Sequence, residues 1–147
     1  MEKILVFKTA VDVTIKRLFD ELGETNIDCL IPKSQFDRYR QEYPAIHFID
    51  ICREGFYELP VEVINAISRQ AYDEVFITFS GREGYSYGNV LELLGQISYK
   101  RAFFYNCNGE RIEIPKGNMI KDTLCRIYIA FTGFLYDMKE RLAGCAG

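Results

Sequence analysis

The chain has 147 residues, of which 48% are hydrophobic and 27% are charged, so its size and composition are those of one soluble globular domain with a single core. The net charge is −3 at pH 7, and Lys and Arg do not gather among aromatic residues. These features argue against a nucleic-acid-binding surface. The apolar run within residues 1–8 is too short for a signal peptide.

Five scattered cysteines and a single histidine limit the metal chemistry of the chain. No two cysteines lie at C-x-x-C spacing, and His47 alone cannot complete a zinc site, so we expect no metal. An odd, scattered set is typical of reduced cysteines and predicts a cytoplasmic protein. Cys29 and Cys52 are expected to fill the core. The sequence identifies no cofactor.

Short apolar runs alternate with amphipathic stretches over the first 115 residues. This rhythm predicts strands that alternate with helices. In chain order, the expected elements are a strand at 3–8, a helix at 12–23, a strand at 27–31, a helix at 34–43, a strand at 46–51, a helix at 60–71, a strand at 74–79, a helix at 89–97, a strand at 101–105 and a short edge strand at 111–114.

Local signals set the expected ends of these helices. Asp12 is a candidate N-cap for the first helix, and Gly23 is expected to end it. Ser34 and Asp37 have the spacing of a capping box at the start of the second helix. On the third helix, the expected inner face includes Ala71. Asn108 and its following glycine predict the turn into the edge strand.

The alternation predicts βαβ units joined by right-handed crossovers. The fold class is therefore α/β: a single Rossmann-like, three-layer domain over residues 1–117. Its mainly parallel sheet would have about five strands, with an antiparallel edge strand in addition.

Residues 118–147 are expected to add a long carboxyl-terminal helix. It would pack on the same domain or on a partner, which makes a homodimer one option. Its uncharged run at 127–136 is too short to cross a bilayer, which needs about 20 apolar residues, so no transmembrane segment is expected. Its apolar stripe consists of Leu124, Ile127, Phe131, Phe134, Leu135, Met138 and Leu142.

The segment at 80–89 is the strongest candidate for a ligand site. It follows a buried strand and precedes a helix, the position where open α/β sheets usually bind ligands. Its glycines allow close backbone approach, its polar side chains offer hydrogen bonds to a phosphate or a sugar, and its tyrosines offer ring stacking. A plain turn with a helix cap is the competing interpretation. The candidate residues are Ser80, Gly81, Arg82, Gly84, Tyr85, Ser86, Tyr87, Gly88 and Asn89.

Other polar residues carry weaker signals. Asp50, Arg53 and Glu54 follow the third strand and form either a charged rim at the same sheet edge or a solvated loop. His47 lies within an apolar run, which favours a core or edge histidine over a catalyst. A flavodoxin-like FMN site lacks its Ser/Thr-rich phosphate loop, and a phosphoacceptor receiver domain lacks its acidic pair after the first strand.

Several short segments carry a family resemblance. They are Lys3-Ile4-Leu5-Val6, Asp12-Val13, Asn26-Ile27-Asp28-Cys29-Leu30-Ile31-Pro32, Tyr43-Pro44 and Ala71-Tyr72-Asp73-Glu74-Val75-Phe76-Ile77. Over residues 1–115 the chain resembles the amino-terminal half of heptosyltransferase-like GT-B glycosyltransferases. That resemblance implies one of two Rossmann-like domains, with an active site in the cleft between them.

The resemblance also implies a role for one residue. In the family, an aspartate in the loop after the first strand acts as general base on the acceptor sugar, and Asp12 stands at the matching place. Val11 stands where the family usually has glycine. The second, nucleotide-sugar-binding domain is missing from this chain, so a partner would have to supply it.

The leading hypothesis is a stand-alone glycosyltransferase-like half domain in sugar or surface-polysaccharide metabolism. It would bind a sugar phosphate or nucleotide sugar through loops 8–12, 52–58 and 80–89. The alternative is a non-catalytic interaction module that pairs through the last helix.

Overall fold

The computed structural model describes residues 1–56, 58–79 and 88–115. Within these ranges, strands and helices follow one another in the predicted order. The elements are β1 (Ile4–Phe7), α1 (Asp12–Leu22), β2 (Ile27–Ile31), α2 (Lys33–Glu42), β3 (His47–Asp50), α3 (Val61–Ser68), β4 (Ala71–Thr78), α4 (Gly88–Leu94), β5 (Ser98–Tyr105) and β6 (Arg111–Ile114).

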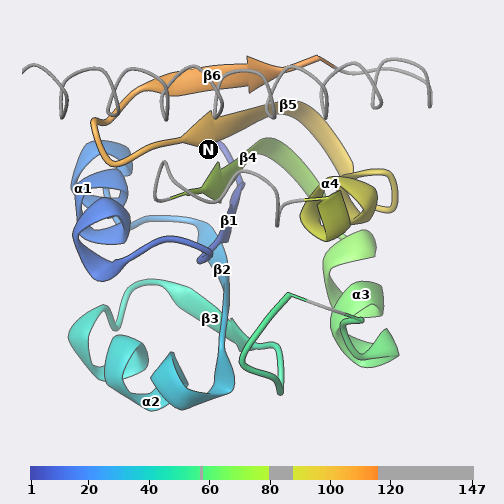
Figure 1. Ribbon diagram of the computed structural model, residues 1–147, viewed down its shortest axis with the longest axis horizontal. Helices are drawn as coiled ribbons and strands as arrows, with labels where there is room; N and C mark the ends of the chain where they lie inside the picture. The colour runs from blue at the N-terminus through green and yellow to red at the C-terminus, as the bar shows by residue number, and fades with distance from the viewer. Residues whose placement is uncertain (57, 80–87, 116–147) are drawn as a thin grey trace, which may run out of the picture.

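The strands described form one six-stranded sheet in the order β3-β2-β1-β4-β5-β6. Strands β1 to β5 are parallel, and β6 returns antiparallel to β5. Helices α1 and α2 lie on one face of the sheet, and α3 and α4 lie on the other (Figure 1). The predicted Rossmann-like, mainly parallel sheet with an antiparallel edge strand is thus confirmed.

The core has one apolar layer on each face of the sheet. Every residue of β1 and β2 is buried, as expected for central parallel strands that are covered on both sides. Val6 packs on the α1 and α2 side, whereas Phe7 packs on the α3 and α4 side. This alternation follows from the period of two along a strand. Strand β1 therefore contributes side chains to the apolar layers on both faces of the sheet.

Two glycine signals are confirmed where the backbone needs a positive φ. Gly23 follows α1 with φ 67°, and its N–H donates to the Phe19 carbonyl at 3.0 Å. Gly109 turns the chain between β5 and β6 with φ 78°. Both conformations cost little only for residues without a Cβ.

Strand β4 begins earlier than its apolar run indicates. Ala71 was expected on the inner face of a helix, but it is the first residue of β4 and is exposed. It pairs with Ser98, which likewise opens β5 before the predicted start at residue 101. The pairing of β4 with β5 extends both strands beyond their apolar runs, into residues that are mostly polar. The predicted helix over residues 118–142, with its apolar stripe, lies outside the described residues.

Candidate functional site

The strand order of the sheet reverses between β1 and β4. From β1 the chain winds to β2 and β3 on one side, and from β4 it winds to β5 on the other. The order reverses between the neighbours β1 and β4, and doubly wound sheets bind ligands at such a point. The segment Lys8–Val11 follows β1, and Phe79 follows β4.

Thr78, the last residue of β4, holds the loop after β1 in place. Its side chain is fully buried. The Thr78 hydroxyl donates to the Phe7 carbonyl at 2.8 Å and accepts the N–H groups of Thr9 and Ala10, each at 3.2 Å. The Thr9 hydroxyl in turn donates to the Thr78 carbonyl. One threonine therefore fixes the backbone at the switch point.

Lys8, the first residue of this loop, is a buried cation with 5% of its surface exposed. Its Nζ donates to the Ala10 carbonyl at 3.0 Å and lies 3.4 Å from Oδ1 of Asp12. The ammonium also lies 5.3 Å from the centre of the Tyr39 ring, a cation–π contact. Burial lowers the pKa of Lys8, and the Asp12 carboxylate offsets part of that shift.

Asp12 accepts donors from helix α2 and from the loop after β1. Its carboxylate accepts the Tyr39 hydroxyl and pairs with Arg38, whose Nη1 lies 3.0 Å from Oδ2. The Tyr39 hydrogen bond is the main cause of a lowered Asp12 pKa, with Arg38 and Lys8 adding to it. Lys8, Asp12, Arg38 and Tyr39 are called the Asp12 cluster below.

The prediction that Asp12 is the N-cap of the first helix is wrong. Helix α1 begins at Asp12 itself, and Val11 occupies the cap position without a side-chain cap bond. The Asp12 carboxylate turns instead to the neighbouring helix α2, because Tyr39 and Arg38 offer stronger donors there. Only the tertiary packing of α2 beside α1 brings these groups together.

The arrangement of Asp12 bears on the chemistry it can perform. A carboxylate with a lowered pKa attracts a proton less strongly, so as held here it is a weak general base. Its side chain is 53% exposed, which leaves the carboxylate open to a hydroxyl from solvent or substrate. A catalytic role for Asp12 stays a prediction.

Replacing Tyr39 by Phe should raise the Asp12 pKa toward its ordinary value of 3.8, because the largest stabilising hydrogen bond is lost. The Asp12 carboxylate stabilises the fold above its unfolded pKa, and this contribution disappears as the pH falls through the lower, folded pKa. The variant should therefore lose acid stability at a higher pH than the wild type. A carboxyl-carbon NMR titration measures the pKa directly.

Tyr43→Phe is the matched control for this titration. Its ring stacks on Tyr39 with centroids 5.8 Å apart, but Tyr43 makes no bond to Asp12. The Asp12 pKa should stay unchanged in this variant. An equal shift in both variants would show that ring packing, and not the Tyr39 hydroxyl, sets the pKa.

The charged residues at the end of β3 and in the loop after it bind that loop and the start of α2. Glu54 accepts both the backbone N–H and the hydroxyl of Ser34. The predicted Ser34–Asp37 capping box is therefore wrong: α2 begins at Lys33, and Glu54 from a distant loop takes the Ser34 donors. Asp50 accepts the Cys52 N–H at 2.7 Å. These contacts favour the loop interpretation of Asp50 and Glu54.

The two cysteines expected in the core differ in outcome. Cys29 on β2 is fully buried, as predicted, and its burial raises the pKa of the thiol. Cys52 is exposed, with a positive φ of 59°, so its assignment to the core is wrong. It lies in the turn after β3, where the chain leaves the sheet.

A second polar cluster lies at the opposite, amino edge of the sheet, where the sequence predicted no site. Asp28 is buried and accepts the Tyr72 hydroxyl at 2.8 Å. Its Oδ1 lies 2.9 Å from Nδ1 of His47. Nζ of Lys3 lies 3.5 Å from Oδ2, the oxygen that accepts the Tyr72 hydroxyl. His47 opens the edge strand β3 and is largely exposed, so the edge interpretation of this histidine holds and the core interpretation does not.

The glycine-rich candidates fall mostly outside the described residues. Ser80 to Tyr87 are not described, so their predicted ligand role stays a prediction. Gly88 is the first residue of α4 and Asn89 the second. This places Asn89 inside the helix and not at its cap position.

The described ranges also bear on metal binding and on membrane insertion. There, no group of three or more His, Cys, Asp or Glu side chains is placed to hold a metal ion. None of the helices described is long and apolar enough to cross a membrane.

No protein-family model, curated protein or solved structure matches the chain. The likeness to heptosyltransferase-like enzymes therefore stays an expectation from the sequence.

Proposed function

We propose that the chain is a glycosyltransferase-like half domain that binds a phosphate- or sugar-bearing ligand at the carboxyl edge of its sheet. The observation that carries this proposal is the reversal of strand order between β1 and β4. Lys8–Val11 after β1 and Phe79 after β4 flank that point. In the loop after β3, the ring of Phe56 lies 5.8 Å from that of Phe7, the last residue of β1. The proposed ligands are sugar phosphates and nucleotide sugars.

The start of α1 supports an anionic ligand at this edge. The N–H groups of Thr14 and Ile15 donate to the Val11 carbonyl. For the preceding amides of Asp12 and Val13, no acceptor is found within the described residues. Free amides at a helix start, together with the helix dipole, favour an anion.

The cations of the Asp12 cluster add to this support. Lys8 brings a positive charge to the loop after β1, and Arg38 brings a half-exposed guanidinium to the same Asp12 carboxylate. An incoming phosphate would compete with Asp12 for Arg38, since both are bidentate acceptors for a guanidinium. The ligand would thereby free the Asp12 carboxylate to accept a hydroxyl proton from an acceptor sugar.

The test is a thermal-shift series with inorganic phosphate, glucose 1-phosphate and UDP-glucose on wild type and Arg82→Ala. A ligand that binds only the folded state stabilises it by about 2.7 kcal/mol at a concentration of 100 Kd. Loss of a charge-assisted hydrogen bond, about 1.5–3 kcal/mol, weakens binding at least tenfold. At tenfold weaker binding the stabilisation in the variant falls to about 1.4 kcal/mol.

Arg69→Ala is the matched control, because Arg69 is an exposed arginine at the far end of α3. It should leave the ligand-induced shift unchanged, and both variants should melt like the wild type without ligand. If the ligand-induced shift fell as much in Arg69→Ala as in Arg82→Ala, the loss would not be specific to Arg82, and Arg82 would not belong to the site. No shift with any of the three compounds would contradict the proposed function itself.

A further inference from the structure

A buried hydroxyl without a partner lies in the first turn of α1. The Thr14 side chain is 1% exposed, and its hydroxyl has no hydrogen-bond partner among the described residues. Buried polar groups are nearly always paired, because a hydroxyl taken out of water without a new partner costs free energy. The backbone N–H of Thr14 donates to the Val11 carbonyl at 3.1 Å, which holds the residue at the helix start. An unpaired hydroxyl at such a fixed position points to a ligand oxygen as its partner.

Thr14 faces the carboxyl ends of β4 and β5. Arg17 and Glu21, further along α1, lie on the same side of the helix as Thr14. Nη1 of Arg17 donates to the Cys107 carbonyl at 2.9 Å, just beyond the end of β5. Oε1 of Glu21 accepts the Tyr105 hydroxyl at 2.8 Å. Thr14 lies one turn nearer to the start of α1, and helical side chains lean toward that end. Its side chain therefore leans toward the switch point, where β4 lies between β1 and β5.

The same turn offers two more donors. The backbone N–H groups of Asp12 and Val13 have no acceptor within the described part of the chain. The Asp12 carboxylate is held on the α2 side by Tyr39 and Arg38. Residues two positions apart on a helix point about 200° away from each other, so Thr14 leaves α1 on a different side. The start of the helix, with its free amides, lies between these two side chains.

We infer that the start of α1 binds a phosphate monoester, whose terminal oxygens accept the Thr14 hydroxyl and the amides of Asp12 and Val13. A monoester carries three terminal oxygens on one phosphorus, which matches these three donors. Each phosphate of a nucleotide sugar is bridged and carries two, so one donor would stay unpaired. The helix dipole favours the higher charge of a monoester as well. This inference rests on the proposed function and narrows its ligands to sugar phosphates.

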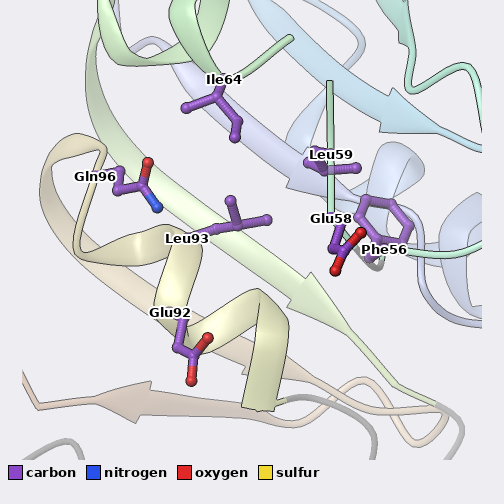
Figure 2. Close-up of a pocket in the computed structure, with 7 residues that line it drawn as sticks. All are labelled: Phe56, Glu58, Leu59, Ile64, Glu92, Leu93 and Gln96. Carbon is purple, nitrogen blue, oxygen red and sulfur yellow. The ribbon is translucent and has the colours of Figure 1, made fainter. Parts of the chain in front are cut away.

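A pocket of about 380 Å³ on the other face of the sheet is less suited to a phosphate. It lies between α3 and α4, and Figure 2 shows Leu93 of α4 facing the loop that carries Leu59. Glu58 brings a carboxylate to this pocket, and no Lys, Arg or His is found among its described lining residues. Like charges repel, so a phosphate is disfavoured there. Glucose 1-phosphate should therefore move the amide NMR signals of Asp12 and Val13 and leave that of Leu93 in place.

Calorimetric titrations of glucose 1-phosphate and UDP-glucose into the wild type and Thr14→Val test the inference. The wild type should bind glucose 1-phosphate more tightly than UDP-glucose. Thr14→Val should weaken glucose 1-phosphate binding about tenfold, because a charge-assisted hydrogen bond is lost. Thr14→Ser keeps the hydroxyl and should bind like the wild type. Without ligand, Thr14→Val should melt at or above the wild-type temperature, because valine has the same shape and no unpaired hydroxyl.

The outcomes separate this inference from the proposed function. If neither compound binds, the proposed function fails and the inference fails with it. If glucose 1-phosphate binds but Thr14→Val binds it equally well, or if UDP-glucose binds more tightly, only the inference is overturned. An equal loss of affinity in Thr14→Ser would assign the effect to the methyl group and overturn it too. A clear fall in the melting temperature of unliganded Thr14→Val would also overturn it, since the hydroxyl would then have a partner in the fold.

Discussion

Replacing Thr78 by Val should lower the free energy of unfolding by about 2 kcal/mol and disorder the loop after β1. Valine has the same shape but no hydroxyl. The Ala10 N–H, which Thr78 accepts at 3.2 Å, would lose its acceptor in a buried setting. The Phe7 carbonyl would lose a donor at 2.8 Å, and the Thr9 N–H would keep only its bond to Phe7.

Urea unfolding followed by circular dichroism measures this loss, with Thr78→Ser as the matched control. Serine keeps the hydroxyl and removes one methyl group, which costs about 1 kcal/mol through lost burial. Hydrogen exchange of the Thr9 and Ala10 amides should speed up in the valine variant and stay slow in the serine variant. If valine proves as stable as wild type and equally protected, Thr78 does not hold the loop.

Replacing Asp28 by Ala should destabilise the domain by about 2–3 kcal/mol. The Tyr72 hydroxyl is buried, and its only described partner is Asp28 at 2.8 Å, so it would be left without an acceptor. His47 is 71% exposed at its side chain and would regain water, as would the partly exposed Lys3. Most of the expected loss therefore comes from the orphaned tyrosine.

Tyr72→Phe and the double variant Asp28→Ala/Tyr72→Phe test that assignment by urea unfolding. Tyr72→Phe alone should cost about 1 kcal/mol, because the carboxylate keeps His47 and Lys3. The double variant should be more stable than Asp28→Ala alone, since no buried hydroxyl remains unpaired. A double variant less stable than either single one would show that Asp28 acts through packing and not through the Tyr72 hydroxyl.

The order and type of the described elements could be read from the sequence, because they follow from local patterns. Continuous apolar runs such as Ile4–Phe7 are typical of central parallel strands, and amphipathic stretches such as Asp12–Leu22 carry a helical apolar stripe. The turns at Gly23 and Gly109 also follow from local backbone requirements. All of these signals lie within a few residues of the feature they predict.

Element ends and polar partners depended on residues that are distant in the chain. Ala71 joined β4 because it pairs with Ser98, and no local apolar signal marks either residue. Ser34 left its expected capping role because Glu54 reaches it from 20 positions away. Local propensity is a weak prior, and a strong tertiary partner overrides it.

The sequence by itself determined the α/β class and the position of Asp12 after the first strand, and its prediction of a site at the carboxyl edge stays a prediction. Only the tertiary structure decided that Tyr39, Arg38 and Lys8 would surround Asp12 and depress its pKa. The physical reason is the distance along the chain over which each interaction acts. Periodicity and turn chemistry act between neighbours in the chain, whereas hydrogen bonds and ion pairs join any groups that the packing of helices and strands brings within about 3 Å.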